Sequence, residues 1–205
     1  MNVLVKHWFA RNKREATIAY FNQMKHLDDF HYVLCLLQYY TAPTAFGNKT
    51  GTMVNLVSAD RDVSSCWNRY KWEFEKRLSL SFIELKSSEE AVLLYFYNPI
   101  TLEKRLKQKK VIQFLEKMGY GACKTLTEYM QHLQNRFAQS KNCPNEVGIF
   151  LGYPVTDVEA FHSQRGDCKC SGYWKCYNRV FLSKCKFIVY DLSKYVVTQK
   201  FRISM

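Results

Sequence analysis

Two stretches of the chain carry hydrophobic residues at the spacing of an α-helix. The first covers residues 62–78, where the apolar residues follow one another at intervals of four, three and four: Val63, Trp67, Tyr70 and Phe74. Such spacing places them on one face of a helix. Residues 125–140 show the same periodicity, with an apolar face made of Leu126, Tyr129, Met130, Leu133 and Phe137. Both stretches are predicted to be helices that pack on a core.

The chain between these two helices has the pattern of β-strands. Residues 79–86 alternate between apolar and polar side chains, and residues 91–98 are almost entirely apolar. A polar turn at 87–90 separates them, so the two strands should form a hairpin. The second strand should be central in its sheet, because a strand that is covered on both faces has apolar side chains at nearly every position.

Shorter signals predict the remaining elements. Helices are expected over 1–27, 101–108, 111–118 and 154–162, the last with Thr156 as its N-cap. Residues 30–40 fit a buried helix or a strand, and a Pro- and Gly-containing loop should follow at 41–51. Strand-like patterns occur at 172–177 and in the tail, 187–203.

These elements predict a single α+β domain, in which a small antiparallel sheet with a central hairpin is packed by several helices. The length of 205 residues fits one domain. We expect a basic helical lead-in at 1–27 and the domain at 28–205, with a divergent basic tail from about 178. Apolar runs such as Tyr32–Leu37 are too short to span a bilayer, and no secretion signal is evident. A cytoplasmic protein without a membrane partner is expected.

Charge is the strongest pointer to a partner. The chain has 30 Lys and Arg against 18 Asp and Glu, a formal net charge of +12. Two basic segments carry candidate nucleic-acid contacts: Arg69, Lys71, Lys104, Arg105, Lys107, Lys109 and Lys110. Cations neutralise phosphates, and neighbouring aromatic residues such as Trp72 can stack on unpaired bases. The alternative is that both segments are solvated faces of helices.

The loop at 41–51 offers a second kind of anion site. Thr44 and Lys49 could bind an anion if the loop precedes a helix N-terminus. The spacing of a true phosphate loop is absent, because Asn48 separates Gly47 from Lys49. A turn without any ligand is the alternative.

Four cysteines near the C-terminus form the only metal-like pattern: Cys168, Cys170, Cys176 and Cys185. Zinc prefers four thiolate or imidazole ligands, but it is usually held by two Cys-x2–4-Cys pairs, and a single intervening residue fits poorly. Reduced, partly buried thiols are the alternative, so no cofactor is expected unless it is zinc.

Catalytic patterns are weak. His31, His132 and His162 lie in no known nucleophile motif, and Glu146 and Asp157 would form a carboxylate pair only if the fold brought them together. An enzyme is therefore the less favoured class.

Three blocks in the chain resemble one bacterial family. They are Ala42-Pro43-Thr44 with Lys49-Thr50, then Pro144 to Pro154 with Asp157-Val158, and Gly172-Tyr173-Trp174-Lys175 with Tyr177. Together they resemble domain-of-unknown-function family 3793 over residues 30–178. The resemblance implies a small cytosolic protein, typical of anaerobic Gram-positive bacteria, and no established reaction. This chain has Asn145 where the family usually has His and Cys176 where it usually has Val, and its tail beyond Tyr177 differs.

Two expectations follow for the blocks and the surface. The apolar residues of the blocks should be core rather than ligand contacts: Phe150, Leu151, Tyr153, Val158 and Trp174. The favoured function is a non-enzymatic binding protein that engages nucleic acid or a nucleoprotein complex, for example as an inhibitor of a nucleic-acid-guided defence system. A metal- or anion-binding regulatory domain, or an enzyme with an unrecognised site, is the alternative.

Overall fold

The computed structural model describes residues 3–58 and 60–203. Two residues of the predicted lead-in, 1 and 2, and two residues of the predicted tail, 204 and 205, lie outside the described ranges. The helices are α1 Val3–Met24, α2 Asp29–Ala45, α3 Val63–Leu78, α4 Pro99–Leu106, α5 Lys109–Leu115, α6 Leu126–Gln139, α7 Val147–Phe150, α8 Val155–His162 and α9 Val180–Ile203. A π-helical turn, Glu116–Tyr120, extends α5. The strands are β1 Gly51–Val57, β2 Ser81–Ser87, β3 Ala91–Tyr97, β4 Cys170–Ser171 and β5 Lys175–Cys176.

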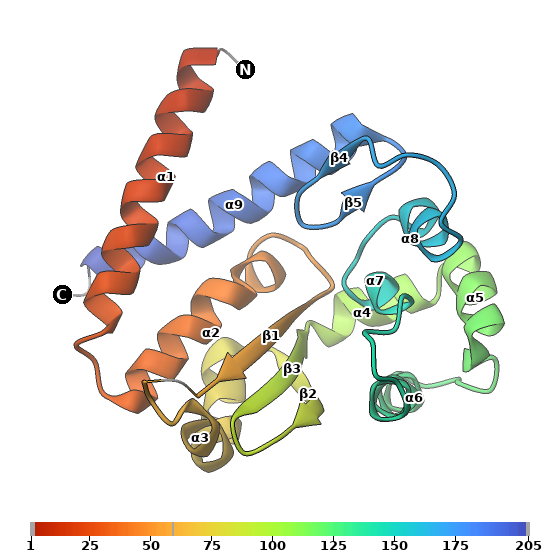
Figure 1. The fold of residues 1–205 in the computed structure, drawn as a ribbon, viewed down its shortest axis with the longest axis horizontal. Coiled ribbons are helices and arrows are strands. Elements are labelled where there is room, and N and C mark those ends of the chain that lie inside the picture. The colour runs from red at the N-terminus through yellow and green to blue at the C-terminus, as the bar shows by residue number, and fades with distance from the viewer. Residues whose placement is uncertain (1–2, 59, 204–205) are drawn as a thin grey trace.

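A three-stranded antiparallel sheet lies at the centre of the fold (Figure 1). Its order is β1-β3-β2, so the predicted hairpin and the central place of its second strand are confirmed. The edge strand β1, which pairs with β3 from Gly51 opposite Tyr97 to Val57 opposite Ala91, was not predicted. The expected α+β class is also confirmed.

Strand β3 supplies side chains to both layers of helices. Val92, Leu94 and Phe96 point into a core shared with α2 and α3. Tyr95 and Tyr97 point into the other core, shared with α4, α5, α6 and α8. This alternation follows from the two-residue period of a strand, and it explains why the whole strand is apolar.

The periodic helices form as predicted. Helix α3 begins after Asp62, whose carboxylate accepts a 3.0 Å hydrogen bond from the Ser65 amide, and Trp67 is buried against Phe74 and Phe96. Helix α6 begins after Thr125, which forms a capping box with Glu128. The predicted cap at Thr156 is wrong, because α8 begins at Val155, two residues before the start that this cap implies, and its N-cap position is Pro154, which has no side-chain donor or acceptor.

Two predictions of local structure are wrong, one for the loop at 41–51 and one for the tail at 187–203. The loop predicted from residue 41 starts later, because α2 continues through Pro43 to Ala45. The tail predicted as strands is the helix α9. Its β-branched residues favour a strand locally, but Phe187, Tyr190, Val197 and Phe201 recur at helical spacing and pack inward, so tertiary burial overrides local preference.

The strand predicted at 172–177 is shorter than expected. Only Lys175–Cys176 is extended, and it pairs with Cys170–Ser171 in a separate two-stranded ribbon. Gly172 lies in the turn, where an added Cβ would come within 2.3 Å of the Phe187 ring on α9. A close approach of this kind requires glycine.

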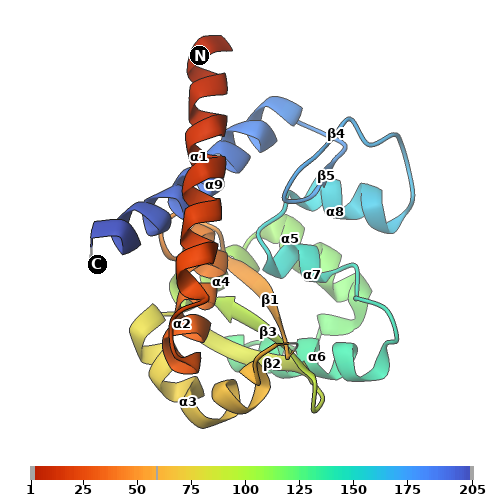
Figure 2. The ribbon, with the colours of Figure 1, turned by 60° about the vertical axis from the view of Figure 1, so that its left-hand side comes forward.

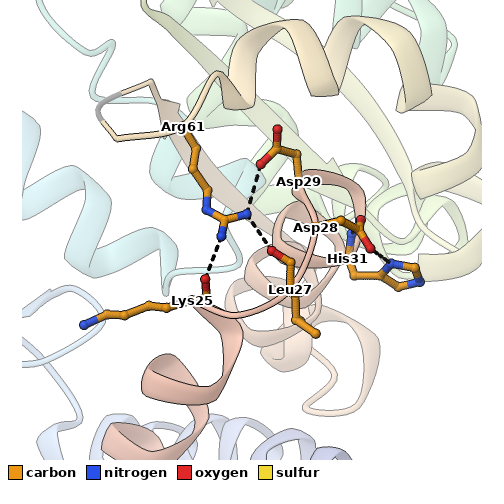
Figure 3. A network of polar contacts seen from close by, with 6 residues as sticks. All are labelled: Lys25, Leu27, Asp28, Asp29, His31 and Arg61. Atoms are coloured by element: carbon orange, nitrogen blue, oxygen red, sulfur yellow. Dashed lines mark hydrogen bonds and ion pairs between the residues drawn. The ribbon is translucent and has the colours of Figure 1, made fainter.

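Arg61 holds the turn between α1 and α2 (Figure 3). Its guanidinium donates hydrogen bonds to the carbonyl oxygens of Lys25 at 2.6 Å and Leu27 at 2.7 Å, and to the Asp29 carboxylate at 2.9 Å. The ring of Tyr32 lies 4.7 Å from the guanidinium carbon. Helix α1 runs from this turn across α9, and its first turns project beyond the rest of the fold (Figure 2).

None of the helices in the described ranges is both long and apolar enough to cross a lipid bilayer.

We expect Phe150→Ala to lower the free energy of unfolding by about 3–5 kcal/mol, because the Phe150 side chain is fully buried. Chemical denaturation followed by circular dichroism measures the change. Phe161→Ala is a matched control, since Phe161 is exposed, and it should cost much less. Equal stabilities of Phe150→Ala and the parent would show that this residue is not core.

Candidate anion-binding site

A half-open pocket of about 390 Å³ lies where α4 leaves the sheet and passes the first half of α9. Its walls come from four parts of the chain: the loop before β1, helix α4, the loop after α7, and α9. The lining residues are Asn48, Thr50, Ile100, Thr101, Lys104, Arg105, Gln108, Gly152, Lys186 and Tyr190.

Three cations converge on this pocket without a balancing carboxylate. Lys104 and Arg105 come from α4, and Lys186 comes from α9. Among the described residues that line the pocket, none is Asp or Glu. Hydroxyl and amide groups from residues such as Thr101 and Gln108 fill the rest of the polar lining. The pocket is therefore a site of uncompensated positive charge.

Arg105 is the most enclosed of the three cations. Its Nε donates a 2.7 Å hydrogen bond to the carbonyl oxygen of Ile149, and its Nη2 donates to the carbonyl oxygen of Tyr153. Both acceptors are neutral, so the charge of the guanidinium is not cancelled. Burial lowers the pKa of Arg105, but an arginine remains protonated in proteins.

The charge of Arg105 affects the protonation of Lys186. Burial lowers the pKa of Lys186, and the positive charge of Arg105 lowers it further. A bound anion would lie between like charges and would favour the charged form of the lysine. The electrostatics of the pocket thus favour an anionic group with several acceptor oxygens, such as a phosphate.

The back wall of the pocket is held by one main-chain carbonyl. The oxygen of Phe150 accepts a 2.7 Å hydrogen bond from the Thr50 hydroxyl and a 2.8 Å hydrogen bond from the Tyr95 hydroxyl. Gly152 follows with φ of +83°, and an added Cβ would come within 2.7 Å of the Thr50 hydroxyl oxygen. Glycine is required at this position for both reasons.

The structure divides the predicted nucleic-acid residues into two groups. Lys104 and the half-buried Arg105 line the pocket from α4, whereas Lys107, Lys109 and Lys110 are exposed beyond it, at the end of α4 and the start of α5. Lys107 pairs with Glu103 at 2.8 Å.

Arg69 and Lys71 belong to a different surface. They lie on α3, which packs against the sheet face opposite to the one that α4 and α5 cover. Lys71 pairs with Glu84 of β2 at 3.2 Å. The two basic segments predicted as nucleic-acid contacts therefore do not form one surface, because the sheet separates them.

Thr44 and Lys49 do not form the predicted anion site. Thr44 lies in the last turn of α2, and Lys49 lies between the end of α2 and strand β1, so no helix N-terminus follows them. Thr44 bonds the Thr52 hydroxyl at 2.8 Å, and the fully buried Lys49 amine donates to the carbonyl oxygen of Gly51. Burial lowers the pKa of Lys49 to about 7, with a further contribution from the Lys194 ammonium.

The four cysteines predicted as a metal site are not gathered into one ligand group. Cys170 and Cys176 are cross-strand partners, while Cys168 and Cys185 are exposed on the preceding loop and on α9. In the ranges that the structure covers, no three His, Cys, Asp or Glu side chains are grouped so that they could hold a metal ion. The arrangement does not fit zinc.

The candidate catalytic carboxylates have structural partners. Glu146 is buried and accepts a 2.7 Å hydrogen bond from Arg136. Asp157 is also buried, and it accepts hydrogen bonds from the Trp174 indole at 3.0 Å and from the amide of Asn178 at 2.8 Å. Glu146 thus ties the loop after α6 to that helix, and Asp157 ties α8 to the turn before α9.

A comparison with protein-family models gives one match. The model described as a protein of unknown function, DUF3793, matches residues 37–205. The chain belongs to this family. No curated protein and no solved structure matches the chain.

The family match reaches further than the three sequence blocks. It includes all of α9, and therefore Lys186 and Tyr190. The sequence alone predicts that this tail differs from the family. The blocks themselves meet in space: Thr50 from the first block bonds Phe150 in the second, and Trp174 in the third stacks on Tyr153 at 5.1 Å. The strand-like pattern of the tail does not indicate that Lys186 and Tyr190 line this pocket, because only the helix α9 brings both to it.

We expect Thr50→Val and Tyr95→Phe each to cost about 0.5–1.5 kcal/mol of stability, because each leaves one hydroxyl on the Phe150 carbonyl. The double variant should cost more than the sum, since the buried carbonyl then has neither hydroxyl donor. A double-mutant cycle by denaturant unfolding measures the excess, and strict additivity would contradict a shared acceptor.

Lys49 should make stability depend on pH. Its pKa is about 7 in the folded protein against an ordinary 10.5, so the unfolded chain binds the extra proton between these values. Stability should therefore rise with pH from about 7 to about 10.5, by up to about 1.4 kcal/mol per unit. Lys49→Met should lack this contribution, and the difference between the two slopes isolates it. Parallel pH profiles would contradict a neutral buried Lys49.

Proposed function

We propose that this protein is a non-enzymatic binding protein for nucleic acid, and that the pocket formed by Lys104, Arg105 and Lys186 receives one phosphate. The observation that carries the proposal is the convergence of three cations with no carboxylate among the described lining residues. Holding like charges close together is unfavourable unless an anion compensates them. A phosphate provides that compensation and several hydrogen-bond acceptors.

The surface next to the pocket favours a polyanion over a single small anion. Lys107, Lys109 and Lys110 continue from the pocket along the end of α4 and the start of α5, and all three are exposed. Ile100, which is 79% exposed, offers an apolar contact at the rim for a sugar or base. A strand of nucleic acid presents phosphates at regular intervals, so it can engage the pocket and these lysines together.

The lining also favours binding over catalysis. The described lining residues include no carboxylate, histidine or cysteine, which are the usual groups for proton transfer or nucleophilic attack. A nucleoprotein complex presents the same phosphates, and covering them there would make the protein an inhibitor of that complex. A small phosphorylated ligand is the alternative that the same pocket fits.

Binding is tested with fluorescein-labelled single-stranded DNA and RNA by fluorescence anisotropy at about 50 and about 200 mM salt. Affinity should fall steeply with salt, because each neutralised phosphate releases counterions. Lys104→Glu/Lys186→Glu should weaken binding by at least about tenfold. Arg69→Glu/Lys76→Glu changes the net charge equally on exposed residues of α3, and it should have a much smaller effect.

Two further measurements separate the partners. Lys107→Glu/Lys109→Glu/Lys110→Glu should abolish nucleic-acid binding if a polyanion occupies the surface, while direct binding of inorganic phosphate to the pocket, measured by isothermal titration calorimetry, should persist. If the parent binds neither DNA nor RNA at about 50 mM salt, nucleic-acid binding is refuted. If the pocket variant binds like the α3 control, the pocket is not the site.

A further inference from the structure

Helix α9 exposes a continuous apolar stripe on its outer side. The exposed large hydrophobic residues of this helix are Phe181, Leu182, Ile188, Val189, Leu192 and Val196. At 3.6 residues per turn, positions 181, 188, 192 and 196 fall on one side, together with the exposed Cys185. Phe181 is 77% exposed. Isolated exposed apolar residues are ordinary, but a contiguous set marks an interaction surface.

The opposite side of α9 is already used by the fold. Tyr190 and Val197 are buried against the rest of the protein, and Phe187 packs on Trp174 at a ring distance of 4.5 Å. A helix that is apolar on both sides is normally covered on both sides. Figures 1 and 2 show no described element over the outer side of α9 between the β4–β5 ribbon and α1.

Helix α9 and its neighbour α1 are both rich in basic residues. By sequence, α1 and α9 together carry nine Lys and Arg against two acidic residues, a net of +7 out of the +12 of the whole chain. The two acidic residues are neutralised locally, since Glu15 pairs with Arg11 at 2.9 Å and Asp191 pairs with Lys13 at 2.8 Å. Lys184 and Lys186 are exposed on the two flanks of the stripe.

We infer that the outer side of α9 binds an anionic lipid surface, with its apolar stripe inserted among the headgroups and Lys184 and Lys186 of α9 on lipid phosphates and carboxylates. The stripe from Phe181 to Val196 is about 22 Å long, and it is the convex side of a helix, which fits a planar, deformable surface. Peripheral binding of this kind requires shallow insertion and anionic lipid together.

An anionic lipid surface is a partner that the sequence alone does not predict. The expectation of no membrane partner follows from the lack of a spanning segment, whereas a helix lying in the interface does not need one. A second copy of the chain is a weaker occupant, because two surfaces with the same excess of positive charge repel each other.

The test uses the full chain and sucrose-loaded vesicles of phosphatidylcholine with 30% phosphatidylserine, compared with phosphatidylcholine alone. The parent should co-sediment with the anionic vesicles at least about tenfold more strongly, and about 500 mM salt should reduce this binding. Phe181→Ser/Ile188→Ser/Leu192→Ser should lower partitioning at least about tenfold at unchanged net charge. Val57→Ser/Trp72→Ser removes exposed apolar residues elsewhere and should bind like the parent.

The outcomes are distinct. The α9 variant should keep the parent's thermal melting and nucleic-acid affinity, which separates this inference from the proposed function. The inference is overturned if the parent does not bind anionic vesicles, if it binds neutral vesicles equally well, or if the α9 variant binds like the control. A dimer in light scattering that the α9 substitutions dissociate would assign the stripe to a second copy instead.

Discussion

The carbonyl oxygen of Phe150 is the point at which the sheet and the candidate site depend on each other. Two buried hydroxyls, from Thr50 and Tyr95, donate to it, and Arg105 binds the carbonyls of Ile149 and Tyr153 on either side. Buried carbonyls without donors are unfavourable, so this short segment adopts a conformation that satisfies all of them. The wall of the pocket is thus fixed by the core rather than by surface contacts.

The same dependence explains the placement of β1. Gly51 begins this strand, and a Cβ there would come within 2.3 Å of the Tyr95 hydroxyl oxygen. The lack of a side chain lets the tyrosine cross beneath β1 and reach Phe150. Since Tyr95 lies on central strand β3, every element that packs on the sheet affects the geometry of the pocket indirectly.

Sequence periodicity predicted the elements whose burial is one-sided or complete. Helices α3 and α6 have a single apolar face, and β3 is apolar throughout, so each leaves a clear pattern. Helix α9 does not, because its inner and outer sides are both apolar, and its aliphatic run favours a strand locally. The pocket could be predicted only in part. Lys104 and Arg105 stand out as a basic run, but Lys186 joins them only through the tertiary packing of α9.

The hydrogen bonds of Arg61 determine which residues of the turn after α1 can be substituted. Arg61 lies within the range matched to the family, whereas α1 lies before it. Two of the acceptors are main-chain carbonyls, which every amino acid supplies, so the side chains of Lys25 and Leu27 can change without loss of these bonds. The third acceptor is the Asp29 carboxylate, so Arg61 tolerates sequence change at positions 25 and 27 but still depends on the side chain of Asp29.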